Sequence, residues 1–198
     1  IASLPNVFEK SRIGQDWFQR NVHPIIREAV ANWTSGSLCI HGPTRVGKTA
    51  GAVALCHRII DAALAPGATA EQLALAAGVR YVFASDIALV ARESALGARP
   101  QMLITAENAT LLVLDEMGLL DVRGAGLDGG AIQTLLDRRY RRRGAWTVVT
   151  SPLTPKQFQK VYGDATVARL KGIGAEIEVI IADLRDELED CVSAVLVG

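Results

Sequence analysis

Eight consecutive residues, from Gly42 to Thr49, have the types and the spacing needed to hold the phosphates of a nucleotide. They spell GPTRVGKT and match the phosphate-loop pattern GxxxxGK[ST]. The two glycines allow the backbone to curl, so that successive N–H groups point toward the β- and γ-phosphates. Lys48 adds a positive charge to these phosphates, and the Thr49 hydroxyl is placed to bind Mg²⁺. The residues predicted to bind the nucleotide are Gly42, Pro43, Thr44, Arg45, Val46, Gly47, Lys48, Thr49 and Ala50.

A second chemically informative segment is the apolar run 111–114, which is followed by Asp115 and Glu116. Four aliphatic residues that run into two acids predict a buried parallel strand with carboxylates at its carboxyl end. Open α/β sheets bind their ligands at that edge. Beside a phosphate loop, Asp115 is predicted to join Thr49 in holding hydrated Mg²⁺. Glu116 is then predicted to orient and polarise the water that attacks the γ-phosphate.

The elements expected around these segments are those of an α/β fold. Residues 38–40 predict a buried strand before the phosphate loop, and residues 50–64 predict a helix after it. Further strands are predicted at 79–84, 111–114, 146–151 and 176–181. Further helices are predicted at 15–33 with an interruption at Pro24, and at 69–77, 87–96, 100–109, 131–140, 155–162, 165–170 and 184–196. The strand at 79–84 precedes the acidic strand, which is typical of the additional-strand class of P-loop ATPases.

Length and composition indicate one well-packed domain. The chain has 198 residues, of which 49% are hydrophobic, so a substantial core is expected. We expect an N-terminal lead-in and helix at 1–34 and a nucleotide-binding domain at 35–198. The glycine-rich stretch 117–130 is predicted to be a mobile loop. Because the chain starts at Ile1 rather than at a methionine, we expect further residues upstream.

Charge and cysteine content restrict the class of protein. Lys plus Arg equals Asp plus Glu, at 21 each, so contact with DNA would need a local basic patch. Three widely spaced cysteines, at 39, 56 and 191, favour reduced thiols in the cytosol and match no zinc-site spacing. No apolar run is long enough to span a membrane. We therefore expect a cytoplasmic protein with no membrane partner.

The basic run RRYRRR at 138–143 permits two interpretations. Cations at the end of a helix complement its dipole, so the run is compatible with a solvated helix terminus. Alternatively, part of it contacts a neighbouring subunit or a nucleic-acid backbone. The same choice between a solvated surface and a binding role applies to Arg92 and Arg99.

Five motifs together resemble the DnaC/IstB branch of the AAA+ ATPases, which comprises bacterial replicative-helicase loaders and transposition helper ATPases. The motifs are HGPTRVGKT at 41–49, FASDI at 83–87, LLVLDEMG at 111–118, LLDRRYRRRGAWTVVTSPLTPKQF at 135–158 and ARLKG at 168–172. Their order and spacing are similar to the family from about residue 33 to about residue 181.

This resemblance implies a P-loop NTPase fold, a three-layer α/β/α sandwich around a mostly parallel five-stranded sheet in the order 5-1-4-3-2, without a helical lid. It also implies that ATP lies between neighbouring subunits of a homo-oligomer, such as a hexameric ring or a spiral. Arg169 aligns with the arginine finger that enters the neighbour's site and stabilises transition-state charge. The implied partners are single- or double-stranded DNA and a helicase or a transposase. DNA contacts are expected from Arg92, Arg99 or Arg123.

Two positions depart from the family pattern. Pro152 stands where the family places an Asn that helps position water, which leaves Thr150 or Ser151 as substitutes, and Ser151 is included among the predicted catalytic residues. Ala165 stands where relatives often have a first arginine. These departures concern the rate of hydrolysis rather than nucleotide binding. The sequence therefore allows an ATP-hydrolysing loader or a nucleotide-gated assembly module with slow hydrolysis. A small-molecule kinase would have no use for the acidic strand or for Arg169.

Overall fold

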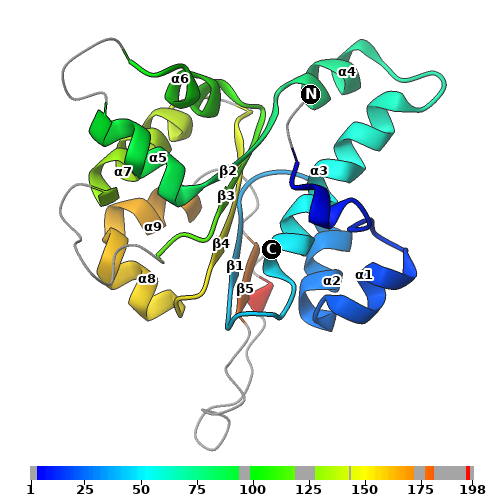
Figure 1. Cartoon of the computed structure of the whole chain (residues 1–198), viewed down its shortest axis with the longest axis horizontal. Coiled ribbons are helices and arrows are strands. Elements are labelled where there is room, and N and C mark those ends of the chain that lie inside the picture. Colours follow the sequence, from blue (N-terminus) through cyan, green and yellow to red (C-terminus); the bar gives the residue numbers. More distant parts are fainter. Residues whose placement is uncertain are drawn as a thin grey trace, which may run out of the picture.

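The structure is a computed structural model that describes residues 4–93, 99–118, 128–142, 144–171, 177–180 and 195–196. Its centre is a sheet with helices on both faces (Figure 1). The strands are β1 (Leu38–His41), β2 (Val79–Phe83), β3 (Leu111–Asp115), β4 (Trp146–Ser151), β5 (Ile177–Ile180) and β6 (Val195–Leu196). Their spatial order is β2-β3-β4-β1-β5-β6, and the first five are parallel. The predicted order 5-1-4-3-2 is therefore confirmed.

The end of the chain differs from the sequence prediction. Residues 184–196 are predicted to form a helix, but Val195–Leu196 pair antiparallel with residues 177–178 of β5 as a short strand. A β-branched residue suits a strand, and β5 offers its unpaired backbone groups on the side away from β1. The predicted helix is therefore wrong at 195–196. Its remaining residues, 184–194, lie outside the described part of the chain.

Two groups of helices sandwich the sheet (Figure 1). One group packs on the face where the helix after the phosphate loop lies, and the other covers the opposite face. The first group is α1 (Asp16–Asn21), α2 (Pro24–Asn32), α3 (Lys48–Leu64) and α4 (Ala70–Ala77). The second group is α5 (Ala84–Glu93), α6 (Gln101–Asn108), α7 (Asp128–Tyr140), α8 (Pro155–Tyr162) and α9 (Asp164–Lys171). Among the described helices, none is both long and apolar enough to cross a bilayer.

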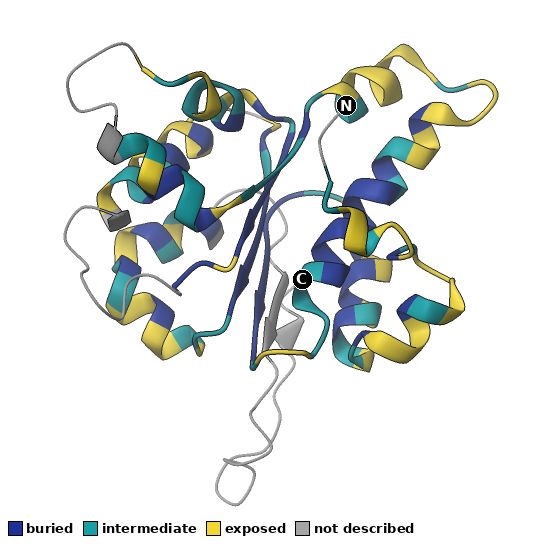
Figure 2. Cartoon of the chain, in the orientation of Figure 1, coloured by how far each residue is buried: buried dark blue, intermediate teal, exposed yellow. Residues whose placement is uncertain are grey.

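The strands are buried because both faces of the sheet are covered. All residues of β3 and β1 are buried, and β4 is buried except for its first residue, Trp146, which is partly exposed (Figure 2). Alternate side chains of β3 enter two separate apolar clusters. Val113 packs in the cluster that contains α3, whereas Leu112 and Leu114 pack against the helices of the other face. This alternation fixes the face on which the last residue of β3 lies.

The predicted helix at 15–33 is divided into α1 and α2 at Pro24. A proline suits the first turn of a helix because its missing N–H would be unpaired there, and the His23 ring accepts a bond from the Ile25 N–H at 3.4 Å. Phe18 of α1 and Trp33 just beyond α2 are fully buried in the same cluster as β1 and α3. The predicted division of the chain at residue 34 stays a prediction, although both sides share this core.

The predicted loop at 117–130 is only partly described. Residues 119–127 lie outside the described part of the chain, whereas 128–130 form the first turn of α7. An acidic residue such as Asp128 is favoured at that end of a helix because it complements the dipole. The prediction of a loop is therefore wrong for these last three residues.

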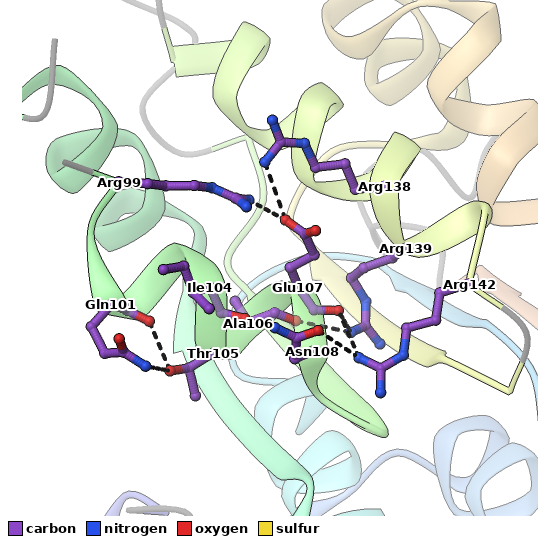
Figure 3. Close-up of polar contacts among 10 residues, drawn as sticks. All are labelled: Arg99, Gln101, Ile104, Thr105, Ala106, Glu107, Asn108, Arg138, Arg139 and Arg142. Carbon is purple, nitrogen blue, oxygen red and sulfur yellow. Dashed lines mark hydrogen bonds and ion pairs between the residues drawn. The ribbon is translucent and has the colours of Figure 1, made fainter. Parts of the chain in front are cut away.

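Arg139 of α7 has a structural role that the basic run 138–143 does not reveal. Its side chain is fully buried, and its guanidinium donates to carbonyl oxygens at the end of α6 (Figure 3) and to acceptors at the start of β4. The acceptors are the carbonyl oxygens of Ala106 and Ala109, both at 2.9 Å, the Trp146 carbonyl and the Thr147 hydroxyl. Burial lowers the pKa of Arg139 to about 10, so it is still charged at neutral pH. One member of the run is thus a helix cap rather than a solvated or binding residue.

Candidate functional site

The phosphate-loop segment lies between the carboxyl end of β1 and the start of α3. Gly47 has a φ of 90°, and a Cβ there would lie 2.8 Å from the Val22 Cα, so both the backbone conformation and the space require glycine. The His23 N–H donates to the Val46 carbonyl at 3.0 Å. The turn between α1 and α2 therefore supports the loop from behind, which the sequence does not indicate.

Lys48 begins α3 and reaches back over the loop. Its ammonium donates to the carbonyl oxygens of Gly42, at 2.8 Å, and Pro43, at 2.7 Å. Burial lowers the pKa of Lys48, and the nearby carboxylates of Asp115 and Glu116 oppose this effect. The ammonium is thus held at the mouth of the loop by neutral acceptors that a phosphate could replace.

Asp115 ends β3 as a buried carboxylate with three hydroxyl donors. The Thr49 hydroxyl donates to Oδ1 at 3.1 Å, the Thr150 hydroxyl donates to the same oxygen, and the Tyr81 phenol donates to Oδ2. Thr49 belongs to α3, Thr150 to β4 and Tyr81 to β2. Burial and the adjacent carboxylate raise the pKa of Tyr81, so the phenol keeps the proton that it donates. Tyr81 was not predicted, because an aromatic residue in a strand usually indicates core packing.

Glu116 leaves the strand in a left-handed conformation with a φ of 61°, which is strained for a residue with a side chain. Its backbone N–H donates to the Thr150 hydroxyl at 3.0 Å. Partial burial, followed by the neighbouring Asp115, raises the pKa of Glu116, while Lys48 acts in the opposite direction. A carboxylate with a raised pKa is a better proton acceptor than an ordinary surface glutamate.

A pocket of about 330 Å³ joins the phosphate loop to the acidic strand. Its lining residues are Phe8, Trp17, Asn21, Thr44, Arg45, Gly47, Lys48, Thr49, Ala50, Glu116, Thr150 and Pro152. Its size lies within the range of small-molecule sites. Phe8, Trp17 and Asn21 come from the N-terminal segment. Sequence analysis missed Phe8 because the lead-in has no periodicity or motif, and missed Trp17 and Asn21 because helical spacing does not show that α1 packs beside the phosphate loop.

The two substitutes considered for the family's Asn lie in different environments. Ser151 is fully buried, donates to the Met117 carbonyl at 2.6 Å and accepts from the Leu153 N–H at 3.1 Å. It does not line the pocket, whereas Thr150 does. Thr150 also links the two acids, because its hydroxyl contacts both the Asp115 carboxylate and the Glu116 N–H. Of the two, Thr150 is the residue that the fold places in the site.

Arg169 of α9 does not line this pocket. Its Nε forms an ion pair with Asp137 Oδ1 of α7 at 2.7 Å, and its side chain is 32% exposed. The residue is therefore neither buried within its own subunit nor near its own phosphate loop.

The other predicted arginines lie elsewhere. Arg99 and Arg138 both pair with the Glu107 carboxylate, and Arg142 bonds the Asn108 side chain at 3.1 Å (Figure 3). Arg99, followed by Arg138, lowers the pKa of Glu107. Since α6 leads into β3 and α7 leads into β4, this group lies at the opposite end of the sheet from the phosphate loop. The Arg92 side chain and the whole of Arg123 lie outside the described residues.

Comparison with known proteins identifies the family and the fold. The sequence model of the family described as IstB-like ATP binding protein matches residues 29–171, more than half of the chain. No curated protein sequence matches the chain. The crystal structure of the DnaC helicase loader is similar with a TM-score of 0.63 and 18% identity, covering 89% of this chain and 99% of that one.

Two further solved structures share the fold. DnaI has a TM-score of 0.52 and 16% identity, covering 90% of this chain and 92% of that chain. AMPPCP-bound DnaA from Aquifex aeolicus has a TM-score of 0.54 and 22% identity, covering 78% of this chain and 44% of that chain. At these identities the likeness establishes the fold.

The Thr150 hydroxyl makes a testable contribution to stability. Thr150→Val keeps the shape of this buried side chain but leaves Asp115 Oδ1 and the Glu116 N–H each short of a partner. We expect the free energy of unfolding to fall by about 1–3 kcal/mol, as measured by urea denaturation. The control is Thr134→Val, an exposed threonine whose hydroxyl bonds within its own helix, with an expected change of about 0.5 kcal/mol or less. Equal stability of the two variants would contradict the proposed link.

Proposed function

Because the chain belongs to the IstB-like ATP binding proteins, the DnaC/IstB type of AAA+ ATPase, we propose that it binds ATP with Mg²⁺ and hydrolyses it to ADP and phosphate. The observation that carries this proposal is the single pocket that Lys48, Thr49 and Glu116 line together. A phosphate loop alone would account for binding. The acid beside it, with a raised pKa, supports hydrolysis.

We assign each residue one step in this chemistry. When the nucleotide binds, the Lys48 ammonium gives up its hydrogen bonds to the carbonyl oxygens of Gly42 and Pro43 and donates to phosphate oxygens instead. Thr49 and Asp115, whose oxygens lie 3.1 Å apart, are suited to hold Mg²⁺, which prefers oxygen ligands and would neutralise phosphate charge. Among the described residues, no group of three or more His, Cys, Asp or Glu side chains could hold a metal alone. Mg²⁺ would therefore bind with the nucleotide.

Glu116 and Thr150 form the hydrolytic side of the proposed site. We assign to Glu116 the role of accepting a hydrogen bond from the attacking water and so orienting it toward the γ-phosphate. Thr150 holds the backbone of Glu116 and the carboxylate of Asp115 in one arrangement. This fixed geometry reduces the reorganisation needed when the water attacks.

Arg169 is proposed to act in the site of a neighbouring subunit, in a homo-oligomer. Its partial exposure and its absence from its own pocket support a role between subunits. An arginine supplied in this way would stabilise the negative charge of the transition state and couple turnover to assembly.

For the biological process, we propose a helicase-loader-type ATPase that acts on DNA in replication. The fold similarity to the DnaC helicase loader and to DnaI over nearly their whole lengths supports this choice. A transposition helper ATPase is the second candidate, favoured by the match to the IstB-like family. In either setting, Pro152 in place of the usual Asn favours slow hydrolysis, so the protein could act as a nucleotide-gated assembly module.

Single substitutions at the two sides of the pocket separate binding from hydrolysis. Glu116→Gln should reduce the rate of phosphate release by at least about 100-fold and leave ATP affinity within a few-fold, because the amide cannot accept the proton. Lys48→Ala should weaken ATP binding itself. Phosphate release with and without single-stranded DNA, together with ATP titration, measures both effects. Unchanged turnover in Glu116→Gln would contradict the hydrolytic assignment, and normal ATP binding by Lys48→Ala would contradict the whole site.

We propose that Arg99 and Arg138, with Arg142 beside them, supply DNA-backbone contacts. Their only described carboxylate partner is Glu107, so the group has an excess of positive charge that phosphates could neutralise (Figure 3). Arg139 adds a further buried positive charge behind them.

The salt dependence of DNA binding distinguishes the loss of these specific contacts from a general loss of positive charge. Arg99→Ala with Arg138→Ala should weaken DNA binding and reduce the slope of log affinity against log salt by about 2, because each backbone contact contributes about 1. The control is Arg20→Ala with Lys160→Ala, which removes the same charge at exposed positions on α1 and α8. An equal loss of slope in the control pair would contradict the assignment.

A further inference from the structure

One carboxylate lies between the proposed finger arginine and a second arginine. Asp137 of α7 uses Oδ1 for Arg169 Nε, at 2.7 Å, and Oδ2 for Arg141 Nη2, at 2.9 Å. Arg141 lies four residues after Asp137, just beyond the end of α7, whereas Arg169 comes from α9. Oδ1 of Asp137 therefore holds the Arg169 guanidinium against α7, while Arg141 holds Oδ2.

The atom that Asp137 contacts determines what Arg169 can still bind. Arginine has five N–H donors in a planar fork, and Nε–H is the one nearest the chain. Among the described residues, Asp137 is the one that forms an ion pair with Arg169, and the Arg169 nitrogen closest to it is Nε. Those two nitrogens provide the geometry that recognises phosphate oxygens. The ion pair thus holds the stem of the guanidinium and leaves its fork available.

Holding the side chain in advance reduces the entropic cost of its later contact. A free arginine side chain loses rotamer entropy when it is fixed, and a side chain that is already oriented loses less. The alternative is that Asp137 withholds Arg169 from phosphate. A partly exposed ion pair contributes little free energy because solvent screens it, so it is too weak to compete with a triphosphate.

We infer that Asp137 is the positioning residue for Arg169 and that, through its contact with Nε, it presents the terminal nitrogens to the nucleotide of the neighbouring subunit. This inference rests on the proposed function, in which Arg169 acts in the neighbour's site. Arg141 supports the arrangement by holding the second oxygen of Asp137.

Turnover and ATP affinity, measured on the same variants, test this role. Asp137→Ala should lower phosphate release about three- to fivefold at saturating ATP and leave ATP affinity within about twofold. Asp137→Asn should recover part of the loss, because its amide oxygen can still accept a bond from Nε. The matched control is Asp61→Ala, which breaks another exposed aspartate pair with an arginine Nε, that of Arg12 at 2.9 Å, and should leave turnover unchanged.

Mixed oligomers test whether the defect acts on the neighbour. A Lys48→Ala subunit cannot use ATP but still offers a correctly held Arg169 to the next subunit. Mixing it with Asp137→Ala should raise turnover above the mean of the two separate proteins. A chain that carries both substitutions should give no such rise when it is mixed with Asp137→Ala. A purely structural defect would lie in the variant's own site and would not be restored.

The Arg169→Ala variant separates the failure of this inference from the failure of the proposed function. If Arg169→Ala loses turnover while Asp137→Ala keeps or gains it, the positioning role is overturned and the arginine finger stands. If Asp137→Ala loses turnover but mixing restores nothing, the positioning role is likewise overturned. If Arg169→Ala keeps full turnover, both the finger and its positioning residue are overturned.

Discussion

The buried carboxylate of Asp115 is the constraint on which the arrangement of the site depends. An ionised carboxylate without donors costs several kcal/mol when it is buried, so the fold must bring hydroxyls to it. β2 and β4 lie on either side of β3 and supply Tyr81 and Thr150. The start of α3 supplies Thr49. The same strand order that buries Asp115 therefore brings the phosphate loop and Glu116 to one pocket.

A second organising element is α7, where three consecutive residues have separate tasks. Asp137 holds Arg169 of α9, Arg138 shares Glu107 with Arg99, and Arg139 is buried as the cap of α6. Because Arg139 fixes α7 against α6 and β4, the helix is anchored between the proposed subunit contact and the proposed DNA contact. A shift of α7 would move both the Asp137–Arg169 pair and the Arg138–Glu107 pair. This would connect the proposed subunit contact physically with the proposed DNA contact.

The parts of the site that the sequence predicts are those whose chemistry depends on local spacing. The phosphate loop and the acidic strand follow from motifs and from the apolar pattern within one segment, whereas the strand order follows from the family resemblance. Tyr81 and Arg139 could not be predicted, because their roles depend on Asp115 and on the end of α6, which are distant in sequence. Phe8 and Trp17 could not be predicted for the same reason. They line the pocket only because the N-terminal segment packs against α3.

The central claim is that Asp115 holds the Mg²⁺ that accompanies bound ATP. Its most direct test is the affinity for ATP with and without Mg²⁺, in the wild type and in Asp115→Asn, by equilibrium titration. We predict that Mg²⁺ tightens ATP binding about tenfold or more in the wild type, a change of about 1.4 kcal/mol. Asp115→Asn should lose this gain and keep the metal-free affinity. An undiminished gain from Mg²⁺ in Asp115→Asn would contradict the account.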